Sequence, residues 1–265
     1  MVYFLPGQNR VLTSLNVLTG PWPFSMWGID VIEVIETKAS NRHHFILVAI
    51  DYFTKWVEPA SYANVTKKVV AKFIRKELIC RYGLPSRIIT DNAINLNNKM
   101  MSELCEEFKI QHHNSSPYRS KMNRAIEAAN KNIKKIIQKM VVTYKDWHEM
   151  LPFALHGYRT SVRISTGATP FSLVYGLEAV LLFEVEIPSL RVLMETQHEE
   201  AEWVQAQRDQ LNFIDEKRLV AVSHGHLYQR RMKKAFDGKV HPREFQESDL
   251  VIRKILPIQK MTKGS

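Results

Sequence analysis

From residue 27 the chain has apolar runs with the length of buried strands, and apolar residues at helical spacing follow them. The pattern predicts, in chain order, strands over 27–35, 45–50 and around 56–57, a helix over 69–79, a strand over 87–90, a helix over 100–108, a strand over 110–113 and a long helix over 123–144. Three strands followed by alternating helices and strands predict an α/β fold with helices packed on a sheet.

The last third of the chain has a weaker pattern. No regular element is expected between 170 and 195. A charged helix is expected over 195–222, and Gly225 weakens any continuation of it. A basic run at 230–234 is typical either of a solvated helix surface or of a DNA contact. A final strand is expected over 249–255.

The composition of the chain predicts a polyanionic partner. The chain has 37 Lys and Arg against 27 Asp and Glu, a formal charge of +10, which favours nucleic acid over a merely soluble basic protein. Its two cysteines, Cys80 and Cys105, exclude a disulfide scaffold and are expected to be small core residues. No apolar run is long enough to span a bilayer, and the N-terminus has no secretory pattern, so no membrane association is expected.

Three acids stand out by their positions. Asp30 lies inside an apolar run, where an uncompensated charge is costly. Asp91 follows the strand expected over 87–90, and Glu127 lies in the first turn of the long helix. Asp91 and Glu127 are separated by 35 intervening residues. Strand ends and helix starts can meet at one edge of an open α/β sheet. Three converging carboxylates would suit two divalent cations of the kind that cut and join phosphodiester bonds.

Each acid can also be explained by a purely structural role, without a metal. Asp91 with Asn92 is typical of a turn closed by an Asx hydrogen bond. Glu127 suits the first turn of a helix and can pair with Lys131. Asp30 can satisfy buried backbone groups or a basic partner. The combination of the three, rather than any one of them, favours a metal site.

The long helix carries a second indication. Glu127 is the only acid between residues 119 and 139, a window with seven basic residues: Arg119, Lys121, Arg124, Lys131, Lys134, Lys135 and Lys139. A solvated lysine face explains the cations but not the lone acid, whereas a metal site beside a phosphate backbone explains both. The histidine pairs at 43–44 and 112–113 have no accompanying Cys-x-x-Cys, so no zinc is expected.

Five strings in order along the chain give it a family resemblance: WGIDVIE, FILVAIDYFTKWVE, RYGLPSRIITDNA, SSPYRSKMNRAIEAANKNIKKI and STGATPFSLVYG. Together they resemble the integrase of gypsy-type LTR retrotransposons, a retroviral-type integrase. The resemblance runs from about Pro21 to the C-terminal region. It is more specific than any single motif, and it favours an integrase over a simple RNase H-like nuclease.

The resemblance implies an RNase H-like mixed five-stranded sheet flanked by helices, with a helical C-terminal extension. It implies that Asp30, Asp91 and Glu127 are the catalytic, metal-binding acids, and that Mg²⁺ or Mn²⁺ is the cofactor. It further implies 3′-end processing and strand transfer of retroelement DNA, a homo-oligomer assembled on the DNA ends, and action in the nucleus. The residues implied to contact DNA are Asn92, Arg119, Lys121, Arg124, Lys131 and Lys134.

The same resemblance divides the chain. It implies a linker remnant over 1–23, the catalytic core over 24–180, a mainly helical extension over 181–245 and the truncated start of a β module over 246–265. We therefore expect a fragment of a polyprotein.

The chain departs from the family pattern near the expected site. Ala93 stands where the family has Gly, and Ser120-Lys121 and Asn123-Arg124 replace the usual residues before the catalytic Glu. Loss of Gly can exclude left-handed backbone angles from a loop. These departures motivate the alternative hypothesis of a catalytically decayed remnant that binds nucleic acid.

Overall fold

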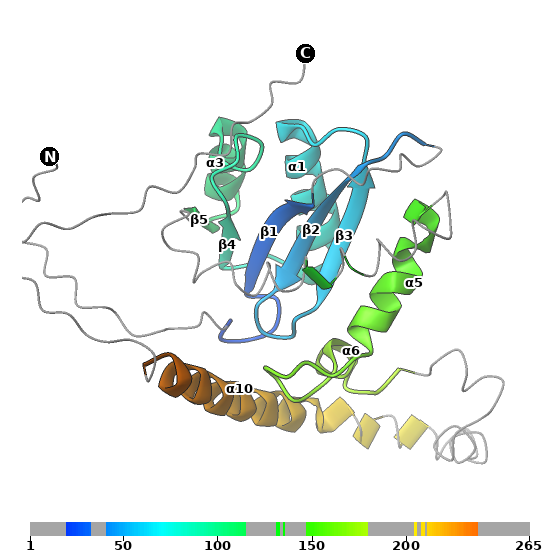
Figure 1. Cartoon of the computed structure of the whole chain (residues 1–265), viewed down its shortest axis with the longest axis vertical. Helices are drawn as coiled ribbons and strands as arrows, with labels where there is room; N and C mark the ends of the chain where they lie inside the picture. The colour runs from blue at the N-terminus through cyan, green and yellow to red at the C-terminus, as the bar shows by residue number, and fades with distance from the viewer. Residues whose placement is uncertain are drawn as a thin grey trace, which may run out of the picture.

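A five-stranded mixed sheet forms the centre of the molecule (Figure 1). The structure, a computed structural model, describes residues 20–32, 41–114, 131–132, 135, 147–179, 204–205, 208–209 and 211–237. The strands are β1 (Met26–Ile32), β2 (Phe45–Asp51), β3 (Val57–Tyr62), β4 (Arg87–Thr90) and β5 (Gln111–Asn114), in the spatial order β3-β2-β1-β4-β5. The predicted fold class is confirmed.

The pairing pattern determines which strands have their C-terminal ends at the same edge of the sheet. Strand β2 is antiparallel to both β1 and β3, whereas β4 is parallel to β1 and to β5. Strands β1, β3, β4 and β5 therefore all run in one direction and end at the same edge of the sheet. The segments that follow β3 and β4 begin at this edge, which also contains the last residues of β1.

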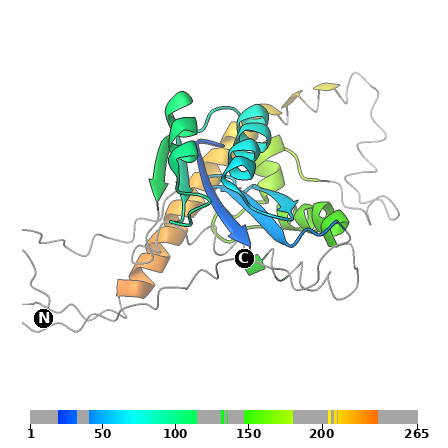
Figure 2. The same ribbon diagram turned by 90° about the horizontal axis from the view of Figure 1, so that it is seen from above.

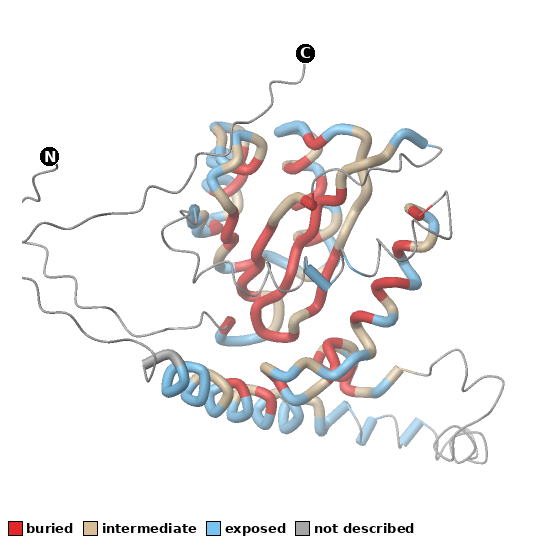
Figure 3. Tube along the Cα trace, viewed as in Figure 1, coloured by how far each residue is buried: buried red, intermediate tan, exposed pale blue. Residues whose placement is uncertain are grey.

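Helices cover both faces of the sheet (Figures 1 and 2). One face packs against a continuous helical stretch formed by α1 (Lys67–Phe73), η1 (Ile74–Ile79) and α2 (Cys80–Tyr82), and against α3 (Lys99–Glu107). The other face packs against α5 (Trp147–Arg159). The most deeply buried chain runs through the central strands, as Figure 3 shows. The core is thus two apolar layers separated by the sheet.

Alternation along β1 assigns its side chains to these two layers. Trp27 and Ile29 belong to the cluster beneath α1 and α3, whereas Ile32 belongs to the cluster beneath α5. Because successive strand residues point to opposite faces, Asp30 lies on the α5 face. Its partner in the register, Val48, belongs to the α5 cluster as well.

Several sequence predictions need correction. The segment from 147 to 175, where no helix was predicted, contains α5 and α6 (Pro170–Tyr175). Cys80 is exposed rather than buried, because it lies on the outer side of the helical stretch formed by α1, η1 and α2, with Lys72 and Lys76. Cys105 is buried as predicted, and burial raises the pKa of its thiol to about 11. The long helix over 123–144 and the strand over 249–255 lie outside the described residues, apart from helical positions 131–132 and 135.

The expected weakening at Gly225 was wrong. Helix α10 (Ile214–Asp237) continues through it without a break and lies beside α6 (Figure 1). A Cβ at Gly225 would be 3.4 Å from the Ser165 carbonyl oxygen, so the small residue permits a close helix–loop approach. Arg218 Nε also donates to the Leu173 carbonyl at 3.0 Å, and Lys217 Nζ donates to that of Gly176. These contacts offset the low helix propensity of Gly.

None of the described helices is long and apolar enough to cross a membrane.

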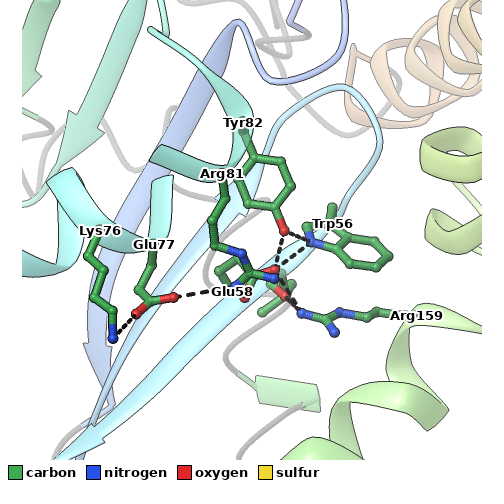
Figure 4. A network of polar contacts seen from close by, with 8 residues as sticks. Trp56, Glu58, Lys76, Glu77, Arg81, Tyr82 and Arg159 are labelled. Atoms are coloured by element: carbon green, nitrogen blue, oxygen red, sulfur yellow. Dashed lines mark hydrogen bonds and ion pairs between the residues drawn. The ribbon is translucent and has the colours of Figure 1, made fainter. Parts of the chain in front are cut away.

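A buried carboxylate joins β3, α2 and α5 (Figure 4). Glu58 accepts from Trp56 Nε1 at 2.8 Å, from the Tyr82 hydroxyl, and from Arg159 Nη2 at 3.0 Å, and pairs with Arg81 Nη1 at 3.1 Å. The Arg159 guanidinium stacks on Trp56, 4.0 Å from the ring centroid. Burial together with this carboxylate raises the pKa of Tyr82. The cluster therefore holds the edge strand to helices on both sides of it.

A second buried acid closes the turn between β2 and β3. Asp51 Oδ2 accepts from the Thr54 amide at 2.8 Å and from its hydroxyl at 2.7 Å, and Oδ1 accepts from the Phe24 amide at 3.1 Å. The residue is fully buried, and this burial raises the pKa of its carboxyl to about 6 despite the hydrogen bonds. Asp51 is thus a structural residue of the turn.

This shift predicts a pH-dependent contribution to stability. The native state holds the Asp51 proton up to about pH 6, whereas the unfolded chain releases it near 3.8. Between these values the native state binds more protons, so a rise in pH favours unfolding. We expect the free energy of unfolding of the wild type, relative to Asp51→Asn, to fall by on the order of 3 kcal/mol from pH 4 to pH 7. Urea unfolding of both proteins at several pH values measures this, and a constant difference would contradict it.

Candidate functional site

The register of β1 and β4 brings two of the three predicted acids together. Ile29 pairs with Thr90 in this parallel ladder. Continuing the register by one residue sets Asp30 opposite Asp91, at the strand ends that share an edge. Neighbouring strands are about 4.8 Å apart, which is within the span of a two-metal site. Asp30 and Asp91 therefore form the candidate site, and both are partly exposed.

The loop after β4 fixes the position of Asp91. Its Oδ1 accepts from the Ala93 amide at 2.9 Å, the Asx turn that the structural interpretation predicted. The Ala93 carbonyl accepts in turn from the amides of Leu96 at 2.9 Å and Asn97 at 2.8 Å, and Leu96 is fully buried in the core. Asn98 then caps α3 by accepting from the Met101 amide at 3.2 Å. The turn and a ligand role are compatible, because a carboxylate has several acceptor positions.

Ala93 does not strain this loop. The four described non-glycine residues with positive φ are Phe24, Arg42, Lys55 and Lys109, and Ala93 is not among them. It packs instead against the apolar cluster beneath α1 and α3. The sequence suggested that Ala in place of Gly could exclude a backbone conformation that the loop needs. The structure shows that the loop forms with Ala93 in an ordinary backbone conformation.

Polar side chains from β5 hold the end of β4. Thr90 is fully buried, and its Oγ1 lies 2.9 Å from His112 Nε2 and 3.2 Å from Asn114 Oδ1. Burial, with a smaller effect of His113, lowers the pKa of His112, so this ring is neutral near pH 7. These contacts tie the residue before Asp91 to the neighbouring strand. Sequence analysis missed this support because it depends on β-strand register.

The strand that carries Asp30 is held by a close contact at Gly28, two residues earlier on the same face. A Cβ there would lie 2.8 Å from Cε2 of the buried Tyr52 ring, so no larger residue fits without displacing that ring. The Val31 amide donates to Asp30 Oδ1 at 2.8 Å. The polar end of β1 is therefore held in place by packing directly behind it.

The donor chemistry of the pair suits hard divalent cations, which take carboxylate oxygens. Glu127 lies outside the described residues, as do Arg119, Lys121, Arg124 and Lys134, so their roles remain predictions. Asn92 is exposed in the loop after Asp91, and Lys131 is an exposed helical residue. Within the described part of the chain, no three His, Cys, Asp or Glu side chains form a metal-binding group.

Comparison with known proteins finds a similarity over the same segment. Residues 21–120 match the integrase core domain family. The chain is 32% identical over 175 residues to the Gag-Pol polyprotein of avian reticuloendotheliosis virus, covering 65% of this chain and 15% of that polyprotein. It is 31% identical over 172 residues to the Gag-Pol polyprotein of baboon endogenous virus (strain M7), covering 64% and 10%. The chain thus spans a small part of these relatives.

A solved structure supports the fold. The cryo-EM structure of a simian T-cell lymphotropic virus intasome, in complex with PP2A regulatory subunit B56 gamma, includes a chain similar to this one with a TM-score of 0.52 and 21% identity. The match covers 59% of this chain and 56% of that one. Asp30 and Asp91 both fall within the segment of residues 21–120 that matches the family.

Proposed function

We propose that this chain contains, over residues 24–180, the catalytic core of a DNA-integrating polynucleotidyl transferase. In this proposal Asp30, Asp91 and Glu127 hold two Mg²⁺ or Mn²⁺ ions. The reaction is 3′-end processing followed by strand transfer, in which the exposed 3′ hydroxyl attacks a phosphodiester of the target. The element is of the gypsy type, as the ordered strings favour, although the relatives named above are retroviral.

The observation that carries the proposal is the parallel register of β1 and β4, in which Ile29 pairs with Thr90, so that Asp30 and Asp91 follow at adjacent strand ends. Both acids lie in a segment that matches the integrase core domain family. Two acids at adjacent ends of parallel strands offer oxygen ligands from different elements. When bound, a cation pair activates the attacking oxygen and stabilises the leaving one. The chain itself positions Asp91 through its Asx turn and the Thr90 contacts that precede it.

The proposal also assigns a DNA surface and a place of action. Asn92 borders the acids, and the basic segment over 119–139, which includes Lys131, would hold the phosphate backbone beside them. The charge of +10 supports a polyanionic substrate. We further propose that the protein acts in the nucleus as a homo-oligomer on the ends of the element's DNA.

A strand-transfer assay tests the proposal. The purified chain is incubated with Mn²⁺, a short labelled duplex that carries the element end, and a target duplex. We expect nicked and joined products that disappear when the metal is chelated. Salt-sensitive DNA binding without nicking or joining would contradict the catalytic proposal and support the decayed remnant.

A further inference from the structure

A basic groove of about 500 Å³ lies between α1–η1 and α3, away from Asp30 and Asp91. Its lining includes four cations from the first helical stretch, Lys68, Lys72, Arg75 and Lys76, together with Ala71, Cys80 and Met100. All four cations are exposed. Figures 1 and 2 show α1 and α3 side by side on one face of the sheet. We call this feature the α1–α3 groove.

The α1–α3 groove starts at the edge that carries the two acids. Helix α1 follows β3, and α3 follows the loop that begins at Asp91, so both helices start where these strands end. Both starts are capped by side chains, Thr66 for α1 and Asn98 for α3. Asp30 itself faces the α5 side of the sheet, so a polyanion bound at the acids reaches the groove by crossing this edge. The groove lies on one of the routes open to it.

Three lysines of the groove lie close enough to repel one another along the helical stretch. Lys68, Lys72 and Lys76 follow one another at intervals of four residues, a spacing at which like charges destabilise a helix. The first turn of α1 begins with Lys67 and Lys68 and has no acid, which opposes the helix dipole. The arrangement is therefore unfavourable for an isolated helix and becomes favourable beside a polyanion.

Two of the four cations have acidic neighbours. Arg75 Nη2 is 2.7 Å from Glu107 and Lys76 Nζ is 3.6 Å from Glu77. Among the described residues Lys68 and Lys72 have no recorded ion pair. Along the helix axis Lys68 to Lys76 spans roughly 12 Å at 1.5 Å per residue, about the length of three to four nucleotides of one strand at 3.4 Å each. The row thus matches a stretch of sugar-phosphate backbone.

We infer that the α1–α3 groove is a second nucleic-acid contact, which binds the phosphate backbone of DNA extending from the acidic edge. The inference rests on the proposed function, because that function supplies the polyanion. Lysine ammonium groups at the end of flexible stems contact phosphates as point charges. The other lining residues, Ala71, Cys80 and Met100, offer no strong hydrogen-bonding group for base edges, so we expect the contact to be independent of sequence.

A second copy of the chain fits the groove less well. A two-fold contact through this face would bring the same row of cations against itself. An acidic peptide would satisfy the charges, but nothing places one at this edge, whereas the proposed substrate reaches it. The test therefore includes an acidic peptide as a competing ligand.

The test compares two double variants of the full chain that lose the same charge. Lys68→Gln with Lys72→Gln removes the two groove cations that form no ion pair with another described residue. Lys67→Gln with Lys99→Gln removes exposed lysines of α1 and α3 that do not line the groove. Fluorescence anisotropy with a labelled duplex gives the affinity at several salt concentrations. We expect the slope of log K against log[salt] to weaken by about 2 in the groove variant and to change little in the control. Circular dichroism checks that both variants fold.

Each other outcome is decisive. Equal slopes for the two variants, with strand transfer retained, would overturn the inference and leave the proposed function standing. If the wild type shows neither salt-dependent DNA binding nor joining, the proposed function fails and the inference fails with it. If the groove variant loses affinity only for a labelled oligoglutamate peptide, the groove binds an acidic protein segment and the inference is overturned.

Discussion

Asp91→Asn is expected to abolish DNA joining while DNA binding persists. The substitution removes one carboxylate of the Asp30–Asp91 pair but keeps an Oδ1 that can accept from the Ala93 amide, so the Asx turn survives. Loss of a ligand to catalytic cations removes several kcal/mol of transition-state stabilisation, a decrease of roughly 10²–10⁴-fold in rate. Strand-transfer yield with Mn²⁺, measured beside duplex affinity, checks this expectation.

A matched acid on α3 provides the control. Glu103 is exposed and pairs with Lys99 at 3.6 Å. Glu103→Gln should therefore leave both joining and DNA affinity at wild-type levels. Asp30→Asn should behave as Asp91→Asn does, since the two acids act on one site. Wild-type joining by either of these two variants would remove its acid from the proposed catalytic set.

The second large effect concerns stability. Glu58→Ala leaves the Arg159 guanidinium, which is mostly buried against Trp56, without its carboxylate partner. Breaking a buried ion pair from one side costs about 3–5 kcal/mol, and Trp56 Nε1 and the Tyr82 hydroxyl lose an acceptor as well. We expect a loss of that size in the free energy of unfolding, measured by urea denaturation at pH 7.

Two further variants separate the buried charge from the other contacts. Glu103→Ala, which breaks only an exposed pair, should change stability by less than about 0.5 kcal/mol. Glu58→Leu combined with Arg159→Met removes both charges and should recover much of the loss, because the two effects are coupled. A loss below about 1 kcal/mol in Glu58→Ala would show that this cluster contributes little.

Local patterns were sufficient to predict the sheet and the helices on one face. The apolar runs of β1 and β2 and the 3.6-residue spacing from Val69 to Ile79 depend on each segment alone. Helix α5 was missed because it contains Pro152 and is held by packing of Trp147, Leu151 and Leu155 on the sheet. Its stability comes from contacts that are distant in sequence.

The candidate site, too, could be predicted from the sequence only in part. Asp30 and Asp51 are both acids in apolar runs, yet Asp51 is a turn residue that is fully buried by Thr54 and Phe24. The difference depends on strand direction: β1 ends at the edge shared with Asp91, whereas β2 runs the opposite way and ends at the other edge. Sequence alone gives the acids, and the strand order decides which of them can meet.

The location of a bound Mn²⁺ ion tests the central claim most directly. Crystals of the chain grown with Mn²⁺ are measured at the manganese absorption edge, where anomalous scattering identifies the ion. We expect a peak about 2.0–2.2 Å from carboxylate oxygens of both Asp30 and Asp91, and its loss in Asp91→Asn. A peak bound by neither acid, or by one acid with the other turned away, would contradict the account.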